Sequence, residues 1–248
     1  MYDDAPLLDR FVFGCDVQDY SSRDTELQGE IQTELRRMLE TAFRRSGLDF
    51  SACAVSPTGD GLLAVLPADV DLVRPVDRLV SELHRLLVTY NGKRVARARI
   101  RLRVAMHADA IRTNAHGEHS GPALVVLSRL LDCAPVRRAL DRFPGAPLAL
   151  IVSAPVFRKV ALSGLSGIRP EQFECVEVDI PAKKFHQSGY VHVPGAPHPQ
   201  PPDGADPPEA ASPRPASTIE VHGNDSVVYG NVSIRAERFT GRDSRGPS

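Results

Sequence analysis

The segment FGCDVQDYSS, residues 13–22, is an apolar, strand-like run that is interrupted by Asp16 and then passes into a polar turn. A second segment, TGDGLLAV at residues 58–65, places Asp60 in a Gly-Asp-Gly turn ahead of another apolar run. Hard divalent cations take oxygen ligands, so two carboxylates on neighbouring strands are suitable donors for a pair of magnesium ions. We therefore expect Asp16 and Asp60 to lie close together.

The composition is that of an ordinary globular protein: of 248 residues, 42% are hydrophobic and 25% are charged, and the formal net charge is −1. A dedicated nucleic-acid or membrane-surface protein would carry a strong basic excess, so these classes are disfavoured. No apolar run approaches the ~20 residues of a membrane span, and the first residues, MYDD, lack the basic and apolar regions of a signal peptide. We expect a cytoplasmic protein that binds neither nucleic acid nor membrane.

Hydrophobic periodicity predicts a βαββαβ unit in the first half of the chain. Apolar residues recur every three or four positions from Leu27 to Phe43 and from Val76 to Tyr90, which is typical of helices that pack on a sheet. Short apolar or alternating runs predict strands over residues 10–17, 50–55, 62–66 and 100–106. This order favours an α+β fold with a ferredoxin-like sheet and helices on one face.

Further elements extend this unit into a domain that we expect to cover residues 1–193. Arg99, Arg101 and Arg103 alternate with apolar residues in the strand at 100–106. We interpret this arginine row as a solvated strand face, with an anionic-ligand surface as the alternative. The later helices are expected at residues 123–131, 136–143 and 155–162, and the later strands at 148–152, 173–178 and 190–193.

The composition changes after Val193. Residues 194–217 are rich in proline, alanine and acidic side chains, which predicts a disordered linker. Residues 218–248 begin with alternating β-formers around Gly-Asn turns, which predicts a short β-prone interaction tail. Within it, SVVYGN at 226–231 weakly resembles the V-Q-x-G core of amyloid signalling motifs, which pair homotypically by cross-β stacking. The alternative is an edge strand that packs on the body or on a partner.

With these elements placed, residues 9–193 resemble the class III nucleotidyl cyclase homology domain, the family of adenylate and guanylate cyclases, as a divergent bacterial member. The resemblance is carried by four segments in the family's order. Residues 16–21 are similar to D-I-x-G-F-T and residues 59–61 to the G-D-G hairpin tip, while residues 104–107 are similar to the G-I-H strand and residues 121–129 to G-x-x-V-N-x-A-x-R.

The resemblance implies a metal-dependent reaction. Family members convert a nucleoside triphosphate into a cyclic nucleotide and pyrophosphate for intracellular signalling. By this resemblance, Asp16 and Asp60 hold two Mg²⁺ or Mn²⁺ ions per site, one activating the ribose 3′-hydroxyl and the other gripping the phosphates. Main-chain N–H groups around Asp19 to Ser22, which include those of Tyr20 and Ser21, would bind the triphosphate, since the first helix begins there.

The resemblance also implies a partner. Arg129 takes the place of the family's transition-state arginine, which arrives from the partner subunit of a head-to-tail homodimer with two shared sites. Lys184 lies near the position where cyclases carry a phosphate-contacting lysine, although a solvated pair with Lys183 is the alternative. For Arg129 the alternative is a solvent-facing helix residue, and for Asp60 it is a purely geometric role in the turn.

Several positions depart from the family pattern. Val125 stands where the family has its transition-state asparagine, and loss of one such hydrogen-bond donor raises the activation free energy by about 2.7–4 kcal/mol. Ser56 occupies the base-selecting position, where adenylate cyclases have Lys and guanylate cyclases Glu. Glu118 occupies the second base-reading position, and it would accept a hydrogen bond from an exocyclic amine. Asp19 replaces a glycine and brings a negative charge to the phosphate loop.

Two functional hypotheses remain open from the sequence. The first is a divergent nucleotidyl cyclase with Asp16 and Asp60 as metal ligands. The second is a catalytically impaired, cyclase-like nucleotide-binding and dimerising module that acts as a signalling or defence adaptor through its tail. The aspartate pair favours the first hypothesis, while Val125 and Ser56 favour the second. A zinc site at His107, His116 and His119 is disfavoured because the spacing is irregular.

Overall fold

A computed structural model of the protein describes residues 7–114 and 118–197. The expected tail at 218–248 and nearly all of the expected linker at 194–217 lie outside the described residues, as does His116. Among the described residues, no helix combines the length and hydropathy that crossing a bilayer requires.

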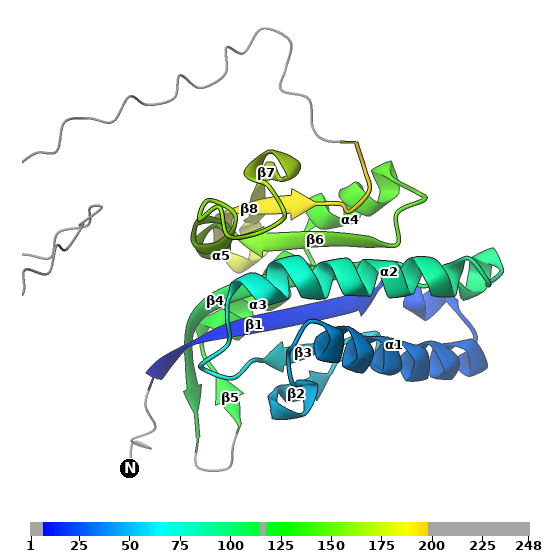
Figure 1. Ribbon diagram of the computed structural model, residues 1–248, viewed down its shortest axis with the longest axis horizontal. Helices are drawn as coiled ribbons and strands as arrows, with labels where there is room; N and C mark the ends of the chain where they lie inside the picture. The colour runs from blue at the N-terminus through cyan, green and yellow to red at the C-terminus, as the bar shows by residue number, and fades with distance from the viewer. Residues whose placement is uncertain (1–6, 115–117, 198–248) are drawn as a thin grey trace, which may run out of the picture. The chain divides into compact units, whose positions relative to one another are not determined.

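The first half of the chain forms the expected βαββαβ unit, which confirms the α+β class (Figure 1). The strand expected at residues 50–55 begins later, because Asp49 accepts a hydrogen bond from Ser51 N (2.9 Å) and turns residues 50–52 into a 3-10 helix. The elements are β1 (Leu7–Val17), α1 (Thr25–Arg45), β2 (Ala54–Pro57), β3 (Gly61–Val65), α2 (Val80–Asn91) and β4 (Leu102–Thr113).

The second half adds strands to the β4 side of the sheet. Its elements are β5 (His119–Ser120), α3 (Pro122–Leu131), α4 (Ala134–Arg142), β6 (Leu148–Ser153), α5 (Ala154–Val160), β7 (Glu174–Ile180) and β8 (Phe185–His192). The strand order is β2-β3-β1-β4-β6-β8-β7, and β5 pairs with β4 outside this path. Strands β4 and β6 are parallel, and the other pairs within the described residues are antiparallel.

The ends of α1 follow from local chemistry. Asp24 caps the helix by accepting a hydrogen bond from Leu27 N (2.9 Å). Gly47 follows the last turn with a φ of 71°, a left-handed conformation that glycine adopts at low cost. Between these ends, α1 buries six side chains against the sheet: Ile31, Leu35, Met38, Leu39, Ala42 and Phe43.

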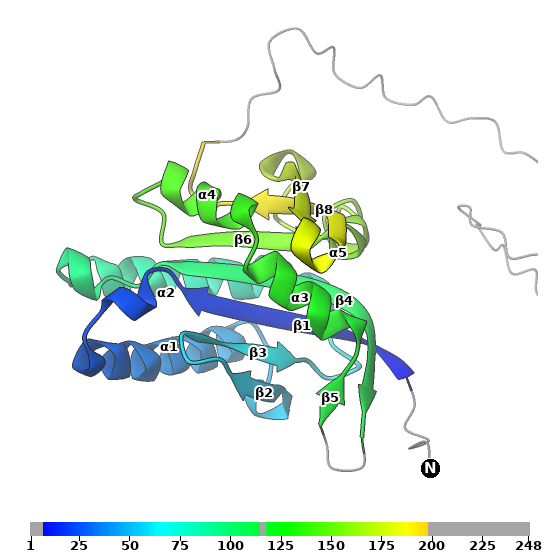
Figure 2. The same ribbon diagram turned by 180° about the vertical axis from the view of Figure 1, so that it is seen from behind.

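The helices form two layers rather than the single expected one. Helices α1 and α2 pack on one face of the sheet (Figure 1), and their buried side chains share a core with Phe13, Leu102 and Val104. Helices α3 and α4 cover the opposite face (Figure 2), over a second core that includes Ala105 and Ile151. All six residues of β6 are buried, as is typical of a strand covered on both faces.

The second helix layer overturns the interpretation of the arginine row as a solvated strand face. The Arg101 guanidinium donates three hydrogen bonds (2.5–3.0 Å) to main-chain carbonyls at and after the end of α4. The Arg103 side chain is 13% exposed and pairs with Asp16. Only Arg99 of the three is fully exposed. The prediction was wrong because the row faces α4 and a carboxylate, which the strand's own sequence does not reveal.

Candidate active site: two carboxylates on paired strands

The structure brings Asp16 and Asp60 to the same end of two paired strands. In the antiparallel register of β1 and β3, Asp16 lies opposite Gly61, the residue that follows Asp60. The main chains are joined at this point, because Val17 N donates a hydrogen bond to Asp60 O (2.9 Å). A single strand pairing therefore brings together two residues that are forty-four positions apart in the sequence, and their carboxylates lie within electrostatic range of each other.

Glycine is required on the far side of the turn that carries Asp60. A Cβ atom at Gly61 would lie 1.8 Å from Cys15 O, which leaves no room for any side chain. Gly59 has a φ of 88°, which favours glycine as well. The Gly-Asp-Gly sequence thus serves the turn geometry, and that geometry also fixes Asp60 against the end of β1.

Asp16 is a buried carboxylate with one dominant partner. It is 7% exposed, and its Oδ1 lies 2.6 Å from Arg103 Nε, which is directly opposite on β4. Burial raises the pKa of Asp16 to about 6, against the opposing effect of the Arg103 charge, and the negative charge of Asp60 contributes to the increase. The carboxylate is therefore more basic than an ordinary aspartate, although it is still mostly ionised at neutral pH.

The segment after β1 forms a 3-10 turn, and α1 begins only at Thr25, later than expected. Asp19 has φ 57° and ψ 28°, so it adopts the left-handed conformation at the position where the resembled family has glycine. Its carbonyl accepts hydrogen bonds from Ser22 N (3.3 Å) and Ser22 Oγ (2.7 Å), which closes a 3-10 turn over Tyr20–Ser22. This turn uses the N–H groups of Ser22 and Arg23 rather than those of Tyr20 and Ser21.

Tyr20 contributes its main chain to this loop more than its side chain. The ring is partly buried against the core under α1, and its hydroxyl donates a hydrogen bond to Gln28 O (3.4 Å). The Asp19 carboxylate lies within electrostatic range of the guanidinium groups of Arg23 and Arg101, where its charge opposes the lowering of their pKa values by burial. These cations offset the negative charge that Asp19 brings to the loop.

Ser56 and Glu118 lie on one hollow of about 620 Å³, which is bounded by the β2–β3 hairpin and the β4–β5 segment. The apolar part of its wall is formed by Leu63, Val65 and Leu124. The Glu118 position is fixed by Asn114, which donates to Glu118 Oε2 (2.8 Å) and accepts from Glu118 N (2.9 Å). A planar, partly apolar ligand with hydrogen-bond donors on its edge would fit these walls.

Arg129 and Lys184 also lie near each other. The Arg129 guanidinium carbon lies 5.0 Å from the centre of the Phe185 ring, and Lys184 precedes that ring in the turn between β7 and β8. Val125, one helical turn before Arg129 on α3, is 47% exposed. Within the described residues, no hydrogen bond or ion pair connects Arg129 or Lys184 with Asp16 or Asp60 of the same chain.

Sequence reasoning missed the ionic partners of this region. Arg103 was grouped with a solvated row, but the strand register places it opposite Asp16. Gln18 Nε2 donates to Asp141 Oδ1 (2.9 Å), and this bond ties the end of β1 to α4. If the strand at 100–106 had been paired with β1 from the sequence alone, the register would have placed Arg103 beside Asp16. No sequence pattern indicates the bond between Gln18 and Asp141.

No zinc site forms among the described histidines. His107 is buried, and its Nδ1 lies 2.8 Å from Ser153 Oγ. His119 Nδ1 lies 2.9 Å from Thr113 Oγ1. The described ranges contain no cluster of three or more His, Cys, Asp or Glu side chains that could hold a metal ion.

Comparisons with known proteins identify the fold. No protein-family model matches the sequence, and no functionally curated protein matches it significantly. An adenylate/guanylate cyclase/hydrolase from Silicibacter pomeroyi is 18% identical with a TM-score of 0.57, over 77% of this chain and 99% of the other. The guanylyl cyclase Cya2 is 11% identical with a TM-score of 0.54, over 76% of this chain and 94% of the other.

A third solved structure is the catalytic core of a rhodopsin-guanylyl cyclase with converted specificity in complex with ATPαS. It is 14% identical with a TM-score of 0.50, over 77% of this chain and 98% of the other. At these identities the similarity establishes the fold. The chain therefore has the fold of class III adenylate and guanylate cyclase domains, and the Asp16–Asp60 pair lies at the end of two of its central strands.

Proposed function

We propose that this protein is a metal-dependent nucleotidyl cyclase that converts a nucleoside triphosphate into a cyclic nucleotide and pyrophosphate. The observation that carries the proposal is the adjacency of Asp16 and Asp60 at the end of β1 and β3, in a fold shared with adenylate and guanylate cyclases. The ATPαS bound to one similar structure supports a nucleotide as the ligand class. The catalytic unit would be residues 1–193, acting in cytoplasmic signalling.

The donor chemistry of the site fits Mg²⁺ or Mn²⁺, because both available side chains offer carboxylate oxygens. Asp16 and Asp60 would hold the ions, two per site. When bound, the ions would lower the pKa of the ribose 3′-hydroxyl and neutralise charge on the phosphates. Arg103 already pairs with Asp16, and the charge of Asp60 adds a second negative group nearby that favours further cations.

The chain's own groups would bind and orient the triphosphate. In the reaction, the 3′-oxygen bonds to the α-phosphorus while the bond from that phosphorus to the bridging oxygen breaks, so the hydroxyl proton and pyrophosphate leave. The N–H groups of Tyr20 and Ser21, in the turn that begins at Asp19, would hold phosphate oxygens. Arg103, beside Asp16, offers a guanidinium at the same end of the sheet.

The remaining groups would come from a second copy of the chain. Arg129 and Lys184 lie close together on the chain's β7–β8 side, and among the described residues neither forms a hydrogen bond or ion pair with Asp16 or Asp60 of its own chain. In a head-to-tail homodimer, the Arg129 guanidinium of one subunit would stabilise charge on the phosphates held by the other. The base would lie in the hollow that contains Ser56 and Glu118.

The position of Val125 predicts slow turnover rather than none. Its side chain is exposed on α3 one turn before Arg129, where a hydrogen-bond donor would face the reacting phosphate of the partner's substrate. Valine donates no hydrogen bond, which lowers the rate by about a hundredfold to a thousandfold relative to a site with that donor. The binding groups of the site are unaffected by this change.

The test is a product assay with the purified full-length chain. The protein is incubated with Mn²⁺ and, separately, with ATP, GTP, CTP and UTP, and cyclic nucleotides are quantified by mass spectrometry over hours to allow for slow turnover. The proposal predicts a cyclic nucleotide from at least one triphosphate, together with an equal amount of pyrophosphate, and neither product when Mn²⁺ is chelated. Absence of product from all four triphosphates would overturn it.

A further inference from the structure

Helix α4 is fixed against the strand end that carries Asp16. Asp141 of α4 accepts a hydrogen bond from Gln18, two residues beyond Asp16 on β1. Arg101 of the 100–106 segment holds the main-chain carbonyls of Leu140 and Phe143 at the C-terminal end of the helix (2.5 and 3.0 Å). Both anchors come from segments of the candidate site, so α4 borders that site.

The alternation of β1 places Asp16 on the face of the sheet that α3 and α4 cover. Cys15 and Val17 point into the core under α1 and α2, whereas Val12 belongs to the opposite core. Gly14 continues the same face as Val12, and a Cβ there would meet Leu127 of α3 at 3.4 Å. Asp16 is the next residue along this face, so it lies on the side of the sheet where α3 passes into α4.

Arg137 occupies the side of α4 that faces β1. It precedes Asp141 by four residues, and residues at this spacing share one side of a helix. Its guanidinium pairs with Asp132, at the junction of α3 and α4. The Arg137 charge also favours the ionised form of Asp16, in the same direction as the charge of Arg103.

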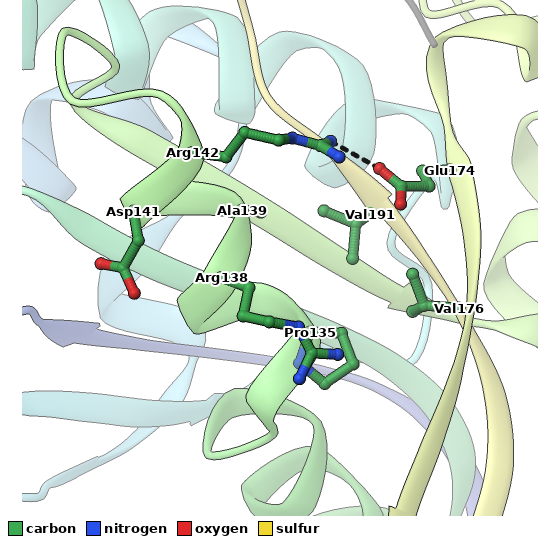
Figure 3. A pocket seen from close by; sticks show the side chains of 8 residues that line it. All are labelled: Pro135, Arg138, Ala139, Asp141, Arg142, Glu174, Val176 and Val191. Carbon is green, nitrogen blue, oxygen red and sulfur yellow. Dashed lines mark hydrogen bonds and ion pairs between the residues drawn. The ribbon is translucent and has the colours of Figure 1, made fainter.

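Arg138, the next residue of α4, provides a contrast because it lines a groove on the β7–β8 side of the helix. The groove, of about 380 Å³, lies between α4 and the β7–β8 pair, and it is lined by Arg138 together with Arg142, Glu174, Val176 and Val191 (Figure 3). Asp141 lines this groove as well, although its side chain points away from Glu174 in this view. Arg137 is not among the residues that line this groove, and its guanidinium pairs with Asp132 instead.

We propose that Arg137 is a phosphate-binding residue of the candidate active site, which exchanges its ion pair with Asp132 for the triphosphate of the substrate. This inference rests on the proposed function. The Asp132 and Arg137 side chains are 57% and 50% exposed, and an exposed ion pair is weak, so exchange costs little. The planar guanidinium suits the oxygens of a phosphate group, and α4 places it within electrostatic range of the carboxylate that would hold the metal.

The test measures binding separately from turnover. Isothermal titration calorimetry with Mn²⁺ and inorganic tripolyphosphate compares the wild-type chain with Arg137→Ala, Arg137→Lys and the matched control Arg138→Ala. We expect Arg137→Ala to weaken tripolyphosphate binding about tenfold or more, as for loss of a charge-assisted hydrogen bond, and Arg137→Lys to recover part of it. Arg138→Ala should change binding by less than about twofold.

A second variant and a kinetic measurement complete the test. Asp132→Asn releases Arg137 from its ion pair and should tighten tripolyphosphate binding. With the preferred triphosphate, Arg137→Ala should raise KM more than it lowers kcat. Equal tripolyphosphate affinity in Arg137→Ala and Arg138→Ala, or no binding by the wild type, would overturn the role of Arg137. Binding that depends on Arg137 without any cyclic product would leave that role intact and overturn the proposed cyclisation alone.

Discussion

Arg103 Nε lies 2.6 Å from Asp16 Oδ1, and the two residues are directly opposite each other in the register of β4 and β1. Their side chains are 13% and 10% exposed. At this depth each charge compensates the other. Removal of either partner would leave the remaining charge buried without compensation, which destabilises the fold. The pair therefore links the stability of the central strands to the state of the candidate metal ligand.

Replacing Arg103 should destabilise the fold. In Arg103→Leu, the Asp16 carboxylate is left buried without its partner, and we expect the free energy of unfolding to fall by about 3 kcal/mol at neutral pH. Denaturant unfolding followed by circular dichroism measures this. The control is Arg142→Leu, which breaks an ion pair with Glu174 whose side chains are 55% and 38% exposed, and which should cost about 1 kcal/mol or less. Equal losses in the two variants would contradict the assignment of a buried pair.

The pH dependence of stability should show the titration of Asp16. Its pKa rises from 3.8 in the unfolded chain to about 6 in the folded protein, so the folded state binds more protons between these values. Its contribution to the free energy of unfolding is therefore fully present below pH 4 and is lost as pH rises through 6, a change of about 3 kcal/mol.

Asp16→Asn removes this titration, so its pH profile measured without metal ions should lack the decline that the wild type shows between pH 4 and pH 6. The measurement is denaturant unfolding in the presence of a chelator, at steps across this interval. Parallel profiles for the two proteins would mean that Asp16 titrates near its ordinary value.

Restoring the missing donor on α3 should raise the rate. Val125 is 47% exposed, so Val125→Asn fits without disturbing the core. If Val125 faces the partner's substrate, we expect kcat to increase by tenfold or more, toward the factor of about a hundred to a thousand that one oxyanion donor contributes. Val88→Asn, at an equally exposed valine of α2, is the control. No gain from Val125→Asn would indicate that this face of α3 does not reach the reacting phosphate.

The base hollow predicts a specific loss in affinity. Glu118→Gln removes a charged acceptor from the wall shared with Ser56, and we expect KM for the preferred triphosphate to rise about tenfold. Tripolyphosphate, which has no base, should bind the variant as it binds the wild type. A matched Glu174→Gln exchange lies in the groove beside α4 and should leave both values unchanged. If Glu118→Gln weakens tripolyphosphate equally, the hollow does not hold the base.

The sequence was sufficient for the order of helices and strands along the first half of the chain, because the decisive signals are local. Alternation and three-to-four spacing marked the βαββαβ unit, and the Gly-Asp-Gly turn placed Asp60 at a hairpin tip, where β3 pairs with β1 beside Asp16. The hollow of Ser56 and Glu118 was anticipated only through resemblance, since these residues lie on segments that meet in three dimensions.

The second helix layer could not be predicted in the same way. The apolar stripes of α1 and α3 have the same spacing in the sequence, and this spacing does not indicate which face of the sheet each helix covers. The roles of Arg101 and Arg103 depend on that choice, because both point toward the layer that was not expected. The bond between Gln18 and Asp141 depends on it as well, since it joins β1 to α4.

The most direct test of the account is Mn²⁺-dependent cyclisation by Asp60→Asn beside the wild type. Asp60 is more accessible than Asp16 and forms no ion pair with another described residue, so this change should leave folding intact, as a thermal unfolding curve would verify. The control is Asp69→Asn, at an exposed loop position. We expect the wild type and Asp69→Asn to form cyclic nucleotide, and Asp60→Asn to form at least a hundredfold less. The loss is expected because a metal ligand contributes to the stabilisation of charge in the transition state. Undiminished product from folded Asp60→Asn protein would contradict it.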